Sequence, residues 1–272
     1  QPRIAKMDGE ARGHQFGLSG RQGQRLPDAG AQVQSRGTRT RVGGQLSVQA
    51  RIEGADTRKP TDLLVSSLPL PLLSRLTTGD RDAALTTAAR SLKFRHLVLV
   101  YVFLKRREVM QEHWVFYPER RYLFSRVFEQ KRLSPEMGPA DRTVLCCDFT
   151  CSAGDEIWTS SDEALAARCI DDLVSQGRIA REEVTGTLVT RSENFYPVYD
   201  RAYVEHLRVV NERLRTVDNL LTTGRIGMYN YNNSDHCVDM GRFIAERLTA
   251  GDAPQAVWEQ LERRVADYRI VD

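Results

Sequence analysis

The stretch that decides the fold runs from residue 224 to residue 241 and reads Gly224-Arg-Ile-Gly-Met-Tyr-Asn-Tyr-Asn-Asn-Ser-Asp-His-Cys-Val-Asp-Met-Gly241. It predicts a glycine-rich turn after a strand, a polar and aromatic loop, and a helix that starts at Ser234 or Asp235. Either residue can cap some of the four free N–H groups there, and the others can point at a negatively charged ligand. Gly224 and Gly227 would let a flat ligand approach the backbone. An ordinary capped helix after a loop is the alternative interpretation.

The segments around this stretch predict an α+β fold. Strands are expected near Leu220 and at 62–68, 94–105, 114–117, 122–128, 143–149 and 184–191, and helices at about 81–91, 160–176, 200–217, 235–248 and 254–268. The run 94–105 is apolar on both faces, as in the interior of a sheet. Strands come first and helices follow between strands, which favours a mixed β-sheet flanked by helices.

Two helix positions carry more specific expectations. Ser160 and Glu163 have the spacing of a capping box, and Gly177 is placed to end the helix that follows. Gly241 lies inside the helix that begins near residue 235 and costs about 1 kcal/mol relative to alanine. We therefore expect close packing at Gly241.

The first 60 residues differ from the rest of the chain. They hold 10 of the 19 glycines and contribute +6 to a net charge of +3, so the rest of the chain carries −3. No window of residues 1–50 shows a sustained helix or strand period, and we expect 1–60 to form a poorly ordered arm. The segment 17–23 lacks the GxGxxG spacing of a phosphate loop. The basic arm predicts no specific nucleic-acid partner.

Composition excludes several classes of protein. The chain has 272 residues, is 41% hydrophobic, and has a mean hydropathy of −0.45. Its longest apolar run has 8 residues, whereas about 20 are needed to cross a bilayer, so no transmembrane segment is expected. The five cysteines contain no CxxC pair, which predicts buried thiols and no metal site. With no signal-like start, these features favour a cytoplasmic protein.

Several residues remain open to two interpretations. His236, beside Asp235 and Asp239, is the best acid–base candidate, or it is a surface histidine near a helix cap. The basic groups 105–107 and 120–121 could receive an anionic substrate or are solvated ends of hairpins. No catalytic residue can be assigned from the sequence.

Three segments resemble the FAD-dependent amine-oxidase-like flavoproteins, which include protoporphyrinogen oxidases and UDP-galactopyranose mutases. Gly224-Arg225, the run Tyr229–Asp235 and the Met240-Gly241 helix resemble their carboxy-terminal flavin-contacting motif. The segment 65–70, Val-Ser-Ser-Leu-Pro-Leu, resembles the return from their substrate domain. Tyr196-Pro-Val-Tyr-Asp200 resembles the stretch before their last flavin strand. The resemblance covers roughly residues 60–250.

The resemblance implies a cofactor and a set of site residues. It implies FAD, held by Gly224, Arg225, Ser234, Asp235 and His236, with the helix start facing the flavin pyrimidine edge. It also implies a substrate lined by four tyrosines: Tyr196, Tyr199, Tyr229 and Tyr231. The resemblance implies a substrate domain at 61–217 and a flavin-contacting segment of a Rossmann-like FAD domain at 218–272.

The chain departs from this family at one motif. The family opens with a strand and a GxGxxG loop that holds the FAD pyrophosphate, and this sequence contains no GxGxxG. We therefore expect a shortened form with only the substrate domain and the flavin-edge motif.

Three functions remain open at this point. The first is an FAD-dependent oxidoreductase of the amine-oxidase or protoporphyrinogen-oxidase type, which acts on a small molecule and passes electrons to a separate acceptor. The second is a UDP-galactopyranose mutase-like flavoenzyme that acts on a sugar nucleotide. The third is a non-catalytic remnant or binding module.

Overall fold

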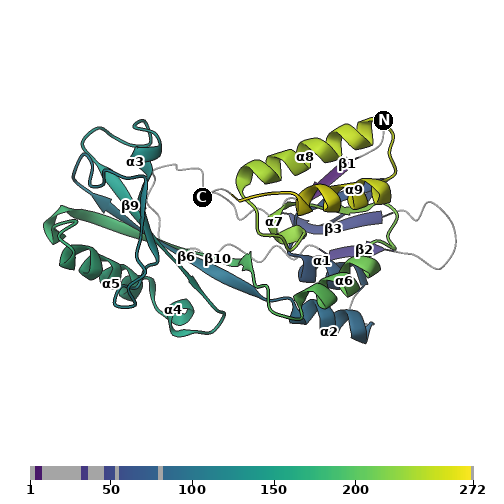
Figure 1. Ribbon diagram of the computed structural model, residues 1–272, viewed down its shortest axis with the longest axis horizontal. Helices are drawn as coiled ribbons and strands as arrows, with labels where there is room; N and C mark the ends of the chain where they lie inside the picture. The colour runs from purple at the N-terminus through teal and green to yellow at the C-terminus, as the bar shows by residue number, and fades with distance from the viewer. Residues whose placement is uncertain (1–3, 8–31, 36–45, 53–54, 79–81, 271–272) are drawn as a thin grey trace. The chain divides into compact units, whose positions relative to one another are not determined.

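The computed structural model describes residues 4–7, 32–35, 46–52, 55–78 and 82–270, which form two compact units (Figure 1). The first unit takes in the chain up to Lys93 and again from Pro197, and the second is Phe94–Tyr196. The boundaries expected from the sequence, at 60 and 217, differ from this division. The reason is pairing: the strand at 63–66 pairs with the strand at 220–222, which groups 61–93 with the C-terminal part of the chain.

The second unit is built on a five-stranded antiparallel sheet. Its strands are β6 (Phe94–Leu104), β7 (Trp114–Phe116), β8 (Arg126–Glu129), β9 (Thr143–Cys151) and β10 (Val184–Pro197). They lie in the order β10-β6-β9-β8-β7, and β6 pairs with β9 along almost its whole length. Helices α3 (Gln130–Leu133), α4 (Glu156–Thr159) and α5 (Asp162–Ser175) and the 3₁₀ turn η2 (Arg181–Glu183) connect the strands.

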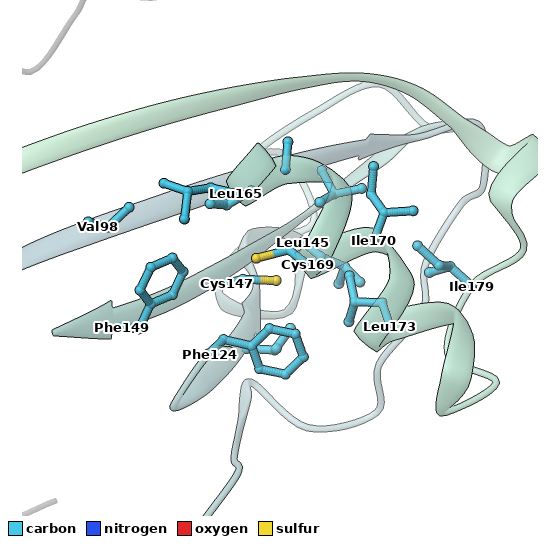
Figure 2. Packing of buried hydrophobic residues seen from close by; sticks show 14 of the residues in the cluster. Val98, Phe124, Leu145, Cys147, Phe149, Leu165, Cys169, Ile170, Leu173 and Ile179 are labelled. Carbon is cyan, nitrogen blue, oxygen red and sulfur yellow. The ribbon is translucent and has the colours of Figure 1, made fainter. Parts of the chain in front are cut away.

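One face of this sheet packs on α5 and forms the core of the second unit (Figure 2). Alternate residues of each strand point to one face, so the core draws on every second residue of β6 and β9. Its fully buried members include Val98, Val100, Val102, Leu145 and Cys147 from the strands and Cys169 and Leu173 from α5. The apolar area that these residues remove from water is what holds α5 on the sheet.

The start of α5 differs by one residue from the prediction. The Ser161 hydroxyl, rather than that of Ser160, accepts the N–H of Ala164 at 3.1 Å. Two adjacent serines offered the same chemistry, and the sequence does not distinguish them. The end of the helix is as predicted, since Gly177 has a φ of +67° in the left-handed region that favours glycine.

The first unit holds two further three-stranded sheets and most of the helices. The parallel sheet has the order β1-β5-β11 and the antiparallel sheet the order β2-β3-β4. The strands are β1 (Ile4–Met7), β2 (Gln32–Ser35), β3 (Leu46–Ile52), β4 (Ala55–Thr61), β5 (Leu63–Ser66) and β11 (Leu220–Thr222). The helices are α1 (Leu70–Thr78), α2 (Ala83–Ser91), α6 (Tyr203–Leu214), α7 (Gly224–Gly227), α8 (Ser234–Thr249) and α9 (Pro254–Ala266). Helix α2 packs on α6, and α8 packs on α9.

The described parts of residues 1–60 are strands, where the sequence predicted a poorly ordered arm. In β3 the apolar residues Leu46, Val48, Ala50 and Ile52 alternate with polar ones, which is a strand period that the low overall hydrophobicity of this segment concealed. The glycine-rich run 17–23 lies outside the described residues. The α+β class is confirmed, with one refinement: the large sheet is antiparallel, and the parallel pairs lie in a separate small sheet.

Candidate functional site

The candidate site is the turn between β11 and α8 in the first unit. Strand β11 ends at Thr222, and the backbone then reverses at Gly224, which has a φ of +78°. The single turn α7 and the loop 228–233 follow, and α8 begins at Ser234, as predicted. The sequence therefore gives a strand, a turn and a helix start in the expected order.

The two glycines of the turn, Gly224 and Gly227, lie close to Ser67 in the segment that follows β5. A Cβ at Gly227 would lie 3.0 Å from Thr222 Oγ1, 3.3 Å from Ser67 Cα and 3.4 Å from the Leu68 carbonyl oxygen. The space that was predicted to admit a flat ligand is thus filled by the segment after β5. Gly241 is the reverse case: a Cβ there would meet nothing within 4 Å in the described part of the chain, so the predicted close packing is wrong.

The cap of α8 is Asn233 rather than Ser234 or Asp235. Asn233 has extended backbone angles, and its N–H donates to Nδ1 of His236 at 3.1 Å. The imidazole of His236 also stacks on the Tyr268 ring, with centroids 4.5 Å apart and planes at 12°. His236 therefore stabilises the helix start through one hydrogen bond and one ring contact. Asparagine is among the strongest capping residues, so its place directly before Ser234 was a usable signal.

The start of α8 keeps hydrogen-bond donors available. Within the described residues, no acceptor is found for the backbone N–H groups of Ser234 and Asp235. The side-chain nitrogen Nδ2 of Asn232 is buried without a partner there, while its Oδ1 accepts from Cys237 Sγ at 3.2 Å. Asn232 is only 1% exposed, and a buried unpaired donor is costly. Three donors thus lie at a site where the helix dipole favours negative charge.

Arg225 lies beside this helix start. Its Nη1 donates to the Asn232 carbonyl at 3.0 Å, and its guanidinium lies 4.4 Å from the centroid of the Tyr231 ring. Arg225 therefore fixes the loop that carries Asn232. Seven of the residues named from the sequence lie within the segment 224–236: Gly224, Arg225, Tyr229, Tyr231, Ser234, Asp235 and His236.

Tyr229 has a structural position that the sequence did not reveal. It is 2% exposed, its φ is +51°, and its hydroxyl lies 2.7 Å from the Lys93 carbonyl and 2.8 Å from the Val198 carbonyl. Burial raises the pKa of this hydroxyl to about 12. Tyr229 therefore holds two backbone segments together. A non-glycine residue in the left-handed region persists only where the surroundings fix it.

Tyr199 and Tyr231 are the more accessible tyrosines of this segment. Tyr199 is 47% exposed, and its hydroxyl accepts the Tyr231 N–H at 2.6 Å. The rings of Tyr199 and Tyr203 are tilted against each other with centroids 4.6 Å apart. Tyr196 ends the second unit and belongs to β10.

The other candidate groups take ordinary positions. Four of the five cysteines, Cys146, Cys147, Cys151 and Cys169, are buried free thiols as predicted, whereas Cys237 is only partly buried. Burial raises the pKa of the Cys147 thiol, which faces Cys169 in the core (Figure 2). Arg106 lies 3.8 Å from Glu183, and Arg121 lies over the Tyr122 ring at 4.6 Å. In the part of the chain that is described, no cluster of three His, Cys, Asp or Glu residues could hold a metal.

The residues at the α8 start fit one edge of a flavin. The pyrimidine edge of a flavin presents hydrogen-bond acceptors and gains negative charge on reduction, and the free donors of Ser234, Asp235 and Asn232 match both properties. The fit covers this edge alone, since the sequence holds no GxGxxG loop for the pyrophosphate.

Comparison with known proteins shows similarity of fold to two solved structures. No model of a known family matches the chain, and no curated protein matches it. The fold matches that of reduced UDP-galactopyranose mutase at 17% identity, with a TM-score of 0.67 over 83% of this chain and 48% of that chain. It also matches a protein assigned as a protoporphyrinogen oxidase from Exiguobacterium sp. 255-15 at 17% identity, with a TM-score of 0.56 over 78% and 46% of the two chains.

This likeness is one of fold. The chain spans just under half the length of both structures. The similarity of fold to a UDP-galactopyranose mutase and to a protein assigned as a protoporphyrinogen oxidase, first suggested by three short segments, is confirmed. Within the described residues, no helix has the length and apolar character needed to cross a bilayer.

Proposed function

We propose that this chain contributes the flavin-edge segment and the substrate sheet of an FAD-dependent oxidoreductase of the amine-oxidase or protoporphyrinogen-oxidase type. The observation that carries the proposal is the start of α8, where two backbone N–H groups have no acceptor within the described residues and the amide nitrogen of Asn232, two residues before the helix, is buried without a partner. The similarity of fold to the two solved structures supports it.

The chain's own residues would bind and polarise one edge of the cofactor. The N–H groups of Ser234 and Asp235 and the Nδ2 of Asn232 donate to its acceptor edge, and the dipole of the 16-residue helix α8 stabilises negative charge there. Arg225 holds the loop in place through the Asn232 carbonyl. FAD, when bound, would supply the hydride-accepting centre of the reaction.

His236 and Gly224 support this edge indirectly in the proposal. The His236 ring accepts the Asn233 N–H and stacks on Tyr268, so it positions the helix start. Gly224 makes the turn that brings the loop to the helix. The accessible tyrosines Tyr199 and Tyr231 are proposed to contact substrate, Tyr196 remains a further candidate, and Tyr229 acts as a positioning residue.

A mutase-like reaction on a sugar nucleotide is the second candidate. One observation favours it: the TM-score to the reduced UDP-galactopyranose mutase is 0.67, against 0.56 for the oxidase. Calorimetry with UDP distinguishes the two, because an amine or porphyrinogen oxidase has no reason to bind UDP. Saturable UDP binding would support the mutase, and its absence would support the oxidase.

The test of the flavin site is titration of the full chain with FAD, followed by flavin fluorescence and visible absorbance. We expect saturable binding, and we expect Asn232→Asp to weaken it by roughly tenfold, because a carboxylate replaces a donor to a charge-bearing edge. Asn230→Asp is the matched control, since Asn230 lies two residues away and lines a separate cavity with Trp258 and Glu262. Absence of FAD binding, or an equal loss in both variants, would contradict the proposal.

A further inference from the structure

The first unit contains a cavity of about 150 Å³, and none of the donors proposed for the flavin edge lines it. Its walls come from helices α6 and α9, from Thr222 at the end of β11, and from Met228 and Asn230 in the following loop. These elements belong to one unit, so the site, which we call the α6–α9 cavity, does not depend on the second unit. A cavity of this volume accommodates a single six-membered ring.

The apolar lining of the α6–α9 cavity is held in place by the protein itself. Trp258 has no exposed surface, Val265 is 5% exposed, and Leu207 of α6 lies in the same lining. The Trp258 indole N–H donates to Glu262 Oε1 at 3.0 Å, and the Arg215 guanidinium lies 5.9 Å from the centroid of the Trp258 ring. Because both contacts fix the indole, this wall is formed before any ligand arrives.

The polar lining is a hydrogen-bonded group around Glu262. Its Oε1 accepts from Asn211 Nδ2 at 3.2 Å as well as from Trp258, and its Oε2 accepts from Arg215, whose charge compensates that of the carboxylate. Since a carboxylate only accepts hydrogen bonds, Asn211 must present its Nδ2 to Glu262 and keep its Oδ1 as an acceptor. Within the described residues, no donor reaches this Oδ1 atom.

Asn230 supplies a second side-chain amide to the cavity. Its backbone N–H donates to the Arg225 carbonyl at 2.9 Å, which fixes the residue in the loop. Its side-chain amide lines the cavity and has no hydrogen-bond partner in the part of the chain that is described. The Asn230 amide therefore offers a donor to a bound molecule, and the Asn211 oxygen offers an acceptor.

The charges around the cavity disfavour ions as ligands. An anion would lie near the Glu262 carboxylate, and a cation would compete with Arg215 for that carboxylate. A neutral molecule meets neither obstacle. Trp258 and Val265 favour an apolar ring, and the two asparagine side chains favour a group that has one donor and one acceptor, which a carboxamide supplies.

We propose that the α6–α9 cavity binds a neutral, single-ring carboxamide. The ring packs against Trp258 and Val265. The carboxamide oxygen accepts a hydrogen bond from Asn230 Nδ2, and the carboxamide N–H donates to Asn211 Oδ1. The site stands independently of flavin binding, because none of these side chains belongs to the proposed flavin edge.

The test compares three probes of nearly equal size, each titrated into the full chain by calorimetry: benzamide, acetophenone and benzoate. Acetophenone keeps the carbonyl group but lacks the N–H donor, and benzoate is an anion. We expect benzamide to bind saturably and about tenfold more tightly than acetophenone, because acetophenone leaves the Asn211 oxygen unpaired. Benzoate should also bind more weakly than benzamide, since it brings a negative charge close to Glu262.

Three variants locate the binding in the cavity. Ala266→Leu enlarges a side chain of the lining and should weaken benzamide binding at least tenfold. Ala245→Leu is the matched control, because Ala245 is likewise an exposed helical alanine but lies on α8, outside the lining. Asn230→Leu should weaken benzamide and acetophenone by about the same factor, because both probes carry the carbonyl oxygen that accepts from Asn230.

Four results would overturn the inference. They are no saturable binding of benzamide, equal affinity for benzamide and acetophenone, unchanged benzamide binding in Asn230→Leu, and an equal loss in Ala266→Leu and Ala245→Leu. If Ala266→Leu fails to fold, Asn230→Leu still decides the matter, because within the described residues that side chain makes no hydrogen bond that its loss would break. Failure of FAD to bind would leave this test unaffected.

Discussion

At the scale of single residues, two glycines that look alike in the sequence have opposite surroundings. We predict that Gly227→Ala destabilises the protein by about 1–3 kcal/mol, because the new Cβ would lie 3.0 Å from Thr222 Oγ1 and 3.3 Å from Ser67 Cα. Gly241→Ala should instead stabilise it by roughly 0.5–1 kcal/mol, since alanine suits a helix interior and the site is open. Urea unfolding of both variants measures the two signs. A loss of stability in Gly241→Ala would show that the helix packs more closely than described.

Tyr229 carries the second residue-scale prediction. Removing its hydroxyl in Tyr229→Phe leaves the Lys93 and Val198 carbonyls without this donor, and we expect a loss of about 1–2 kcal/mol in the free energy of unfolding. Tyr203→Phe is the matched control from the same aromatic cluster, because Tyr203 is held there by ring contacts with Tyr199 and Tyr229. Equal stability of both variants would contradict the positioning role of Tyr229.

At the scale of elements, a charged cluster ties the start of α8 to the end of α9. Asp239 accepts from Arg264 Nε at 2.6 Å and from the Tyr268 hydroxyl at 2.5 Å, and these bonds, with Arg264 first, hold the pKa of the Asp239 carboxyl below its usual range. A group whose pKa is lowered in the folded state stabilises at pH above its unfolded value of about 3.9 and loses that contribution as the pH falls.

We expect the free energy of unfolding to fall modestly as the pH is lowered, because Asp239 loses its favourable contribution on protonation. The native protein should unfold at lower urea concentration at acid pH than at neutral pH, and Asp239→Asn should flatten part of that difference. The contribution is modest because the Arg264 side chain is 40% exposed and that of Asp239 is 23% exposed, so that water partly screens the pair. Asp235→Asn is the control, since Asp235 is 78% exposed at the same helix start. An identical pH profile in the native protein and Asp239→Asn would rule out this contribution.

The elements themselves were largely predictable, and the reasons differ from one to the next. A long apolar run predicted strand β6, and apolar residues at 3.6-residue spacing predicted helix α5. Both elements lie within a few residues of their predicted bounds. Helix caps were less predictable. Ser160 and Ser161 both carry a hydroxyl that could cap α5, and Asn233 caps α8 where Ser234 or Asp235 was expected to do so. Strand β3 was missed because its alternation lies in a glycine-rich, polar segment.

The candidate site was predictable in sequence order but not in the role of each side chain. The turn, the loop and the start of α8 lie where the motif predicted them. The roles of Tyr229 and Gly227 depend on Lys93, Val198 and Ser67, which are distant in sequence and come together only through tertiary pairing. Local pattern cannot supply such contacts, because register and packing decide them.

At the scale of the whole molecule, the division into two units makes a prediction about folding. The buried residues of the core beneath α5 run from Val98 to Ile179 in the described part of the chain, and the partly buried residues packed on them also lie within Phe94–Tyr196. A fragment of 103 residues with its own buried core is within the size range of independent domains. We therefore expect Phe94–Tyr196 expressed alone to fold, with dispersed amide NMR signals and a cooperative unfolding transition.

Two substitutions make this prediction specific to the core. Leu173→Ala, at a residue with no exposed surface that packs in this core, should lower the stability of the fragment and of the second unit in the full chain by the same 2–5 kcal/mol. Leu261→Ala, equally buried but in α9 of the first unit, should leave the transition of the second unit unchanged in the full chain. If Leu261→Ala lowered both transitions equally, or if the fragment remained unfolded, the two units would form one cooperative structure.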